Sequence, residues 1–125
     1  MILHNAFLKD HELEGISFQG SDLQGSDFSG ADLYGANLCE SNFDSCLLVY
    51  ADLRSAFLYK ATFRNADMRR ARFSLDQMGG ALVLRGVDFS NANLDEADFT
   101  GALYDSATVF PNGFHPEKRG LRLMS

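Results

Sequence analysis

Ala31-Asp32-Leu33-Tyr34-Gly35 is followed directly by Ala36-Asn37-Leu38-Cys39-Glu40, so a small residue, Asp or Asn, and Leu recur in the same order in two consecutive pentads. The order returns in Ala51-Asp52-Leu53-Arg54-Ser55. A period of five matches neither the 3.6-residue period of a helix nor the two-residue period of a strand. It indicates a chain that turns a corner after every five residues.

The pentad extends outward from this segment over most of the chain. Large apolar residues occupy every fifth position from Leu3 through Met78 to Val83 and, after a shift of one residue, from Phe89 to Val109. The position two residues earlier is mostly Ala, Ser or Cys. We expect both positions to point inward, with four pentads closing a square coil. Stacked coils then share a core that no single coil can bury alone.

Residues 20 positions apart are expected to lie above one another in such a stack. Two of the four predicted interior columns are Leu3–Leu23–Phe43–Phe63–Val83–Tyr104 and Phe18–Leu38–Leu58–Met78–Phe99. The phase shift before Phe89, together with Asp76 at a small inward position, predicts a bulge or loop within residues 74–88. The pentads suffice for about five and a half coils.

These pentads resemble those of the pentapeptide-repeat protein family, and the resemblance covers residues 1–109. It implies an all-β fold, a right-handed quadrilateral β-helix. Residues 110–125 are expected to form a non-repeat C-terminal cap or tail, because Pro111 and Pro116 cannot continue a hydrogen-bonded ladder. This tail is similar to the ending of many cyanobacterial members of the family, with His115 where Asp is usual.

The two ends of the predicted rod differ. Phe110, Phe114 and Leu121 can cover the last coil, whereas no cap is evident at the N-terminal end. Exposed sheet edges favour pairing with another chain. We therefore expect a monomer, or an end-to-end dimer through an open N-terminal edge.

The net charge of −6 is distributed in bands along the chain. Residues 1–53 hold nine acidic residues and one basic residue, residues 54–87 hold seven basic and two acidic residues, and residues 88–116 are acidic again. The basic band predicts a collar around the rod. One interpretation is a solvated surface with ion pairs 20 positions apart, Asp44 with Arg64 and Asp52 with Arg72. The other is a surface for an acidic partner.

The candidate partner surface combines collar arginines with apolar residues at outward positions. Its members are Arg54, Arg64, Arg69, Arg70, Arg72, Leu47, Val49, Tyr50, Phe57 and Tyr59. Leu82, Leu84 and Leu103 are also expected to stack on the outside. Clusters of this kind can mark contact surfaces.

No catalytic constellation, metal-binding motif or cofactor motif is evident, so we expect neither an enzyme nor a bound cofactor or metal. The two cysteines lie seven positions apart, which places them on different sides of a coil, so we expect no disulfide between them. Cys46 occupies a small inward position and is expected in the core, whereas Cys39 points outward. Gly20, Gly25, Gly30 and Gly35 have the spacing of corner residues with positive φ.

The leading hypothesis is a non-enzymatic protein–protein interaction module with an unidentified protein partner. An alternative comes from the family resemblance: some members mimic DNA and inhibit DNA gyrase or topoisomerase. The basic collar weakens this alternative, since DNA carries one negative charge per ~1.7 Å of axis. The acidic balance argues against direct nucleic-acid binding, and the absence of a long apolar run or signal-like start predicts no membrane contact and a cytoplasmic location.

Overall fold

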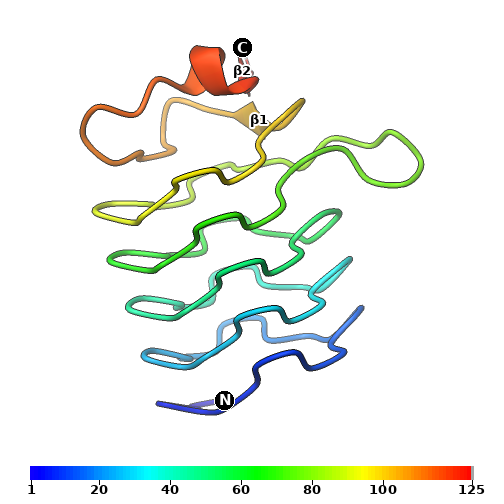
Figure 1. The fold of residues 1–125 in the computed structure, drawn as a ribbon, viewed down its shortest axis with the longest axis vertical. Coiled ribbons are helices and arrows are strands. Elements are labelled where there is room, and N and C mark those ends of the chain that lie inside the picture. Colours follow the sequence, from blue (N-terminus) through cyan, green and yellow to red (C-terminus); the bar gives the residue numbers. More distant parts are fainter. Residues whose placement is uncertain (125) are drawn as a thin grey trace.

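The computed structural model describes residues 1–124, which form a stack of coils joined by parallel backbone bridges (Figure 1). In the N-terminal half each bridge joins residues 20 positions apart, as in Ile2 with Asp22 and Asp22 with Asn42. A turn follows each bridging residue, so four five-residue sides make one step of the stack. The architecture is a β-helix, with the N-terminus at one end and the C-terminus at the other (Figure 1).

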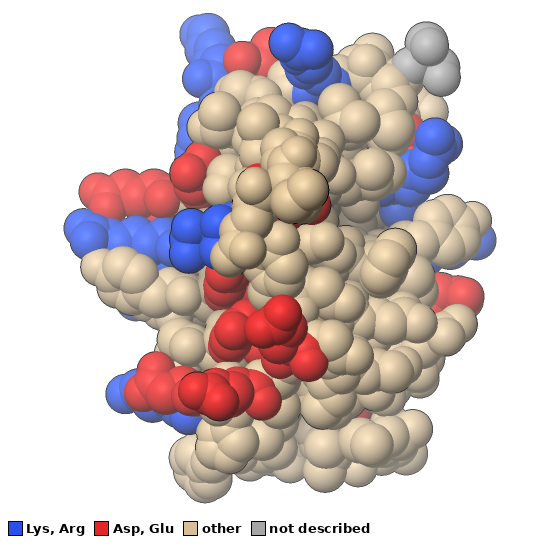
Figure 2. All heavy atoms as spheres, turned by 90° about the vertical axis from the view of Figure 1, so that its right-hand side faces the viewer, with Lys and Arg blue, Asp and Glu red and all other residues tan. Residues whose placement is uncertain are grey.

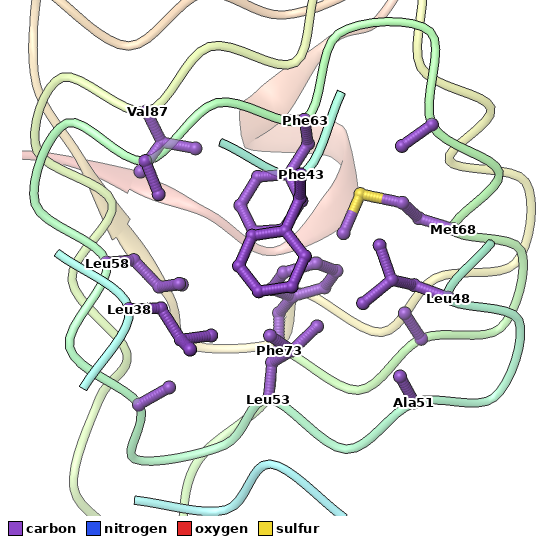
Figure 3. Close-up of a cluster of buried hydrophobic side chains, with 14 of the residues drawn as sticks. Leu38, Phe43, Leu48, Ala51, Leu53, Leu58, Phe63, Met68, Phe73 and Val87 are labelled. Atoms are coloured by element: carbon purple, nitrogen blue, oxygen red, sulfur yellow. The ribbon is translucent and has the colours of Figure 1, made fainter. Parts of the chain in front are cut away.

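The interior is filled by one large apolar side chain from each side of each coil. Looking along the axis, Phe43, Phe63 and Phe73 project toward one another from the surrounding chain (Figure 3). The rings of Phe43 and Phe63 are stacked with centroids 5.2 Å apart. Ala51 and Cys46 occupy small inward positions and are buried. The predicted alternation of large and small inward residues is therefore confirmed from residue 18 to Phe73.

Asp and Asn recur before the large residue because their side chains hold the corners. The Oδ1 atom of Asp32 accepts a hydrogen bond from the N–H of Tyr34 at 3.0 Å, and Asn42 does the same for Asp44 at 2.8 Å. Such Asx turns are a common local use of these residues. The next residue has a left-handed backbone, as at Gly35 with φ 69°. The predicted positive φ at the corner glycines is confirmed.

The pentad register changes after Phe73, at a different place from the prediction. Residues 74–81 leave the coil as a loop, and the next bridges join residues 26 positions apart, such as Thr62 with Asp88. The chain therefore re-enters the coil six residues later than an unbroken repeat would. Met78, predicted inward, lies in the loop and is 92% exposed.

The loop also reverses the predicted roles of three neighbouring residues. Leu82 and Leu84, predicted outward, are fully buried at the small and large inward positions. Val83 was predicted inward but occupies the outward position between them. The prediction was wrong because it continued the pentad through residues 74–81, which belong to no side of a coil.

The two interior columns named above are correct only up to the loop. Phe89, not Val83, stacks on Phe63 with centroids 5.6 Å apart. Phe99 stacks on Phe73 at 4.5 Å instead of continuing the Leu58 column. One further residue is added before the bridge of Asp88 with Val109, so Val109 is exposed and Phe110 takes the inward position over Phe89.

The C-terminal end of the stack is covered. Strand β1 (Leu103–Tyr104) pairs in parallel with β2 (Arg122–Leu123), and the short 3-10 helix η1 (Pro116–Arg119) lies between them in sequence (Figure 1). The ring of Phe114 stacks on Phe110 at 4.8 Å, and Leu121 is buried. His115 occupies the N-cap position of η1, and its side chain makes no capping hydrogen bond. It therefore does not replace the Asp that similar family members carry at this position as a side-chain cap.

The N-terminal end is open. Met1, Ile2 and Phe7 are exposed, and Phe7 keeps 86% of its surface accessible. Within residues 1–124, the backbone N–H and C=O groups of Ile2, Phe7, Glu12 and Ser17 make no backbone hydrogen bond. These four residues form the free edge of the first coil. In the same described range, no helix has the length and apolarity needed to cross a membrane.

Candidate interaction surfaces

The arginines of the predicted collar are largely engaged by carboxylates. Arg54 donates to both oxygens of Asp52 at 2.9 Å, and Arg72 approaches the same carboxylate at 3.6 Å. Partial burial alone would raise the pKa of Asp52, but hydrogen bonds from Arg54 outweigh burial and hold the pKa below its usual range. Arg54 also lies over the ring of Tyr34.

The remaining collar arginines of the predicted surface are paired as well. Arg64 contacts Asp44 at 3.0 Å, Arg69 contacts Asp67 at 2.8 Å, and Arg70 contacts Glu96 at 2.6 Å. The predicted pairs Asp44–Arg64 and Asp52–Arg72 are thus both confirmed. Exposed pairs of this kind contribute little to the stability of the fold, because water and salt screen them. They reduce the positive charge that the collar offers to a partner.

The two apolar clusters of the predicted surface lie on opposite sides of the rod. Leu47, Val49 and Tyr50 belong to one side, whose bridging residues are Phe7, Asp27, Leu47, Asp67 and Asn93 (the Leu47 side). Phe57 and Tyr59 belong to the side two corners away, whose bridging residues are Ser17, Asn37, Phe57, Val83 and Leu103 (the Phe57 side). The structure does not bring the clusters together. Arg70 covers Tyr50, donating to its hydroxyl at 2.5 Å.

The Phe57 side carries a groove of about 310 Å³ beside the 74–81 loop. Phe57 and Val83 are exposed outward residues that line it, together with Tyr59, Arg85 and Asp76 of the loop. The view onto this loop shows broad uncharged surface, with acidic and basic side chains gathered mainly in its left half (Figure 2). Sequence reasoning missed the groove because it placed Val83 inside the rod.

The 74–81 loop is held in place by several contacts. Asp76 accepts hydrogen bonds from the N–H groups of Met78 and Gly80 at 2.9 and 2.7 Å. The N–H of Gln77 donates to the Tyr34 hydroxyl at 3.3 Å. Leu75 packs where Gly101 leaves room, since a Cβ at Gly101 would lie 2.6 Å from Leu75 Cδ2. These contacts fix the position of the loop, which forms one wall of the groove.

The backbone ladder is open inside this groove. Elsewhere on the Phe57 side each bridging residue is hydrogen-bonded to the next coil, as when Leu38 donates to Phe57 at 2.8 Å and Leu84 to Leu103 at 2.8 Å. The corresponding bonds from Leu58 to Val83 and from Val83 to Ala56 are not made, and the N–H of Ser55 is unbonded too. Pairing resumes at Lys60, which donates to Arg85 at 3.0 Å.

Two neighbouring cations, Arg85 in the groove lining and Lys60 beside it in the ladder, are left without carboxylate partners in the described residues. Among residues 1–124, neither Lys60 nor Arg85 forms an ion pair, and Lys60 lies over the ring of Tyr59 at 5.3 Å. The predicted partner surface did not include either residue. A 20-residue spacing would place Arg85 above Asn65, whereas the loop places it beside Tyr59. Lys60 and Arg85 could have been identified as neighbours from the sequence only if the position of the inserted loop had been known.

A larger hollow of about 570 Å³ lies between the last coil and the C-terminal cap. Its main cation, Arg119, is already committed to the carbonyl oxygens of Leu94 and Ala97 at 2.9 and 3.0 Å. Arg119 also stacks over Phe114 at 4.9 Å. These contacts fasten the cap to the rod, so we assign this hollow a structural role.

The cysteines occupy different environments. Cys46 is buried and donates to the carbonyl oxygen of Leu23 at 3.1 Å, and burial raises the pKa of its thiol to about 12. Cys39 is partly exposed at the edge of the groove, and both thiols are free. The predicted core position of Cys46 is confirmed. In the described part of the chain, no group of three or more His, Cys, Asp and Glu residues is placed to hold a metal ion.

We expect a thiol reagent at about pH 8 to label Cys39 rapidly and Cys46 only after unfolding, because the buried thiol is neutral and inaccessible. The Cys39→Ser variant should show no fast phase, and the matched Cys46→Ala variant should keep it. Because the folded pKa of Cys46 is about 12 and its ordinary value is 9.0, its contribution to stability is complete below pH 9.0 and falls as the pH rises toward 12. Fast labelling of both thiols would contradict this placement.

Comparison with known proteins agrees with the repeat described above. The family model of pentapeptide repeats matches residues 12–44, 40–74 and 83–103, with eight copies. The interval between the last two ranges contains most of the 74–81 loop. No curated protein matches the chain.

Several solved pentapeptide-repeat structures are similar. A protein from Nostoc PCC 7120, alr5209, is 31% identical over 96% of this chain and 86% of that one, with a TM-score of 0.37. Rfr23 from the cyanobacterium Cyanothece 51142 is 26% identical, with 87% and 60% covered and a TM-score of 0.41. Trypsin-treated QnrB1, a plasmid-mediated fluoroquinolone resistance protein, is 21% identical, with 86% and 55% covered and a TM-score of 0.56.

The chain thus spans 60% of the length of the Cyanothece protein and 55% of QnrB1. The family match and the likeness to QnrB1 indicate that the coils described here form a right-handed β-helix. The family model covers well over half of the chain, including the coils on both sides of the loop. The chain belongs to the pentapeptide-repeat family.

Proposed function

We propose that this protein is a non-enzymatic interaction module that presents the sides of a rigid rod to a protein partner. The carrying observation is the Phe57 side, where Phe57 is 62% exposed at a position that the two preceding coils fill with the polar residues Ser17 and Asn37. The solid interior supports this proposal, because the rod offers surfaces in place of a deep pocket. Exposed aromatic residues are also enriched at protein interfaces.

The proposal is tested by placing a photo-crosslinking amino acid at one outward position on each side of the rod in cells that make the protein. Suitable positions are Phe57, Thr62, Leu47 and Arg72, one on each of the four sides. We expect a discrete crosslinked protein from position 57 and none from the position on the opposite side, Leu47. No specific crosslink from any of the four positions would refute the interaction-module proposal.

The alternative, a DNA-mimicking inhibitor of DNA gyrase or topoisomerase, is less well supported by this surface. Arg54, Arg64 and Arg69 stand among the carboxylates in the middle of the rod and neutralise them. A DNA mimic needs a row of uncompensated negative charge. Inhibition of gyrase supercoiling by the purified protein would favour this alternative over the interaction module.

We also propose that the open N-terminal end pairs with the same end of a second copy. Its free N–H and C=O groups alternate along one edge, which makes the edge complementary to a copy of itself under two-fold symmetry. Ile2 and Phe7 supply exposed apolar surface next to that edge. At the C-terminal end, by contrast, β2 and the stacked rings of Phe110 and Phe114 cover the last coil.

The Ile2→Asp/Phe7→Asp double variant should shift the dimer to monomer in sedimentation velocity, because it places charges against the pairing edge. The fold should persist, since Asp22 and Asp27 occupy the equivalent positions one coil along. Leu47→Asp is the matched control on the same side as Phe7 and should leave the dimer intact. A wild-type protein that stays monomeric at all concentrations would refute the end-to-end dimer.

A further inference from the structure

We infer that the groove on the Phe57 side binds an extended acidic peptide segment of a partner protein, one that carries a carboxylate beside a large apolar side chain. This inference rests on the proposed interaction function and specifies its site and the chemistry of its partner. It combines three independent observations: unpaired backbone groups, an apolar floor and two unpaired cations.

The first observation is the break in the ladder. The N–H groups of Ser55, Leu58 and Val83 make no hydrogen bond, and the carbonyl oxygen of Ala56 lacks the N–H that every other complete step provides. Leu58 is 1% exposed, so an unpaired N–H at this residue is unfavourable in the free protein. Donors and acceptors are both open, which suits a peptide backbone better than a fatty acid, because a fatty acid carries no N–H donors.

The second observation is the apolar floor. Phe57 and Val83 occupy outward positions that are polar in the coils below, where Ser17 and Asn37 stand. Both side chains line the groove, and Tyr59 continues the apolar surface at its margin. The volume of about 310 Å³ lies at the small end of the range for ligand pockets, which suits one large side chain and its flanking backbone.

The third observation is charge. Lys60 and Arg85 are the cations of the basic band that make no ion pair in the described part of the chain, while its other cations, Arg54, Arg64, Arg69, Arg70 and Arg72, all do. Arg85 lines the groove, and Lys60 lies next to this lining, because it follows Tyr59 and its N–H is bonded to the carbonyl of Arg85. An acidic side chain on the bound segment would supply the missing partner. The one acidic side chain in the groove lining, Asp76, accepts hydrogen bonds from the N–H groups of its own loop.

The test is selection of binders from a random linear peptide library displayed on phage, with the wild-type protein as bait. We expect enrichment of Asp or Glu next to Phe, Leu, Ile or Val. Binding of the selected peptides should weaken by about tenfold or more in the Lys60→Gln/Arg85→Gln variant, as loss of charge-assisted hydrogen bonds implies. Arg69→Gln, on a different side, is the matched control and should bind normally.

Hydrogen exchange supplies a second readout that a merely electrostatic contact would not change. The amides of Ser55, Leu58 and Val83 should exchange faster than those of Leu38 and Leu84 in the free protein and become protected when a selected peptide binds. Neutral or basic consensus peptides, or acidic peptides that bind the Lys60→Gln/Arg85→Gln variant equally well, would overturn the inference. So would dimerisation abolished by this variant, because the occupant would then be a second copy.

The two proposals fail in different ways. A crosslinked partner captured from another side of the rod, together with a library that yields no acidic–apolar consensus, would refute the groove and leave the interaction module standing. Absence of crosslinks from all four sides would refute the interaction module itself, whatever the library selects.

Discussion

Replacing Phe89 with Ala should lower the free energy of unfolding by about 3–5 kcal/mol, among the largest effects of any single substitution in this protein. Phe89 is fully buried and contacts four other rings, with centroid distances of 5.6 Å to Phe63, 5.8 Å to Phe73, and 5.9 Å to both Phe99 and Phe110. Its removal leaves a cavity between the last regular coils and the cap. Because neighbouring coils stabilise one another, the cavity weakens both.

Urea unfolding followed by circular dichroism measures this effect, and Phe57→Ala is the matched control. Phe57 has the same side chain at an outward position, so its truncation should change stability by no more than about 0.5 kcal/mol. Hydrogen exchange should show that Phe89→Ala exposes the amides of the cap and of β1 before those near Leu33. Equal effects of the two substitutions would contradict the interior position of Phe89.

The interior up to Phe73 could be predicted because the pentad places the same two residue types inward at every step. No structural role was predicted for Asp32 and Asn42, yet their side chains hold the corners. The tendency of Asp and Asn to form Asx turns was the available signal. Where local chemistry and repeat register agree, one pentad suffices to assign each residue's role.

The part that could not be predicted follows from the loop. Ala81-Leu82-Val83 and Leu82-Val83-Leu84 both read as an inward small or apolar residue, a middle residue and a large inward residue. The five-residue period favoured the first reading, which kept Val83 in phase. Packing favours the second, because it buries two leucines and leaves one valine outside. The five-residue period by itself does not tell which of the two registers buries more apolar surface.

The groove depends on the same choice of register. Because residues 74–81 lie outside the coil, Arg85 is placed beside Tyr59, and the ladder stays open between Leu58 and Val83. The arginines of the basic band that were chosen from charge alone proved to be paired. Lys60 and Arg85, the two cations of residues 54–87 that form no ion pair in the described part of the chain, were not chosen. The insertion that breaks the repeat thus creates the candidate site.

Deleting residues 76–81 should therefore restore an unbroken repeat and close the groove. The deletion joins Leu75 to Leu82 and removes the six residues by which the register changes. Leu75 then becomes the second corner residue. The equivalent residues of the neighbouring coils, Ser55 and Gly101, have a left-handed backbone. The deletion variant therefore also carries Leu75→Asn, because Asn tolerates this conformation better than Leu. The amides of Ser55, Leu58 and Val83 gain partners, and at about 1 kcal/mol per bond we expect stability to rise by about 1–3 kcal/mol.

Deletion of residues 76–80 is the matched control, because it differs by one residue. This shorter deletion must either bury Val83 in place of Leu84 or accommodate Ala81 as a bulge, and both outcomes leave the ladder imperfect. We expect it to be less stable than the six-residue deletion in urea unfolding and to retain fast exchange at Leu58. The six-residue deletion should also abolish binding of the selected acidic peptides. Equal stability of the two deletions would refute the six-residue register change, because only that register requires this length.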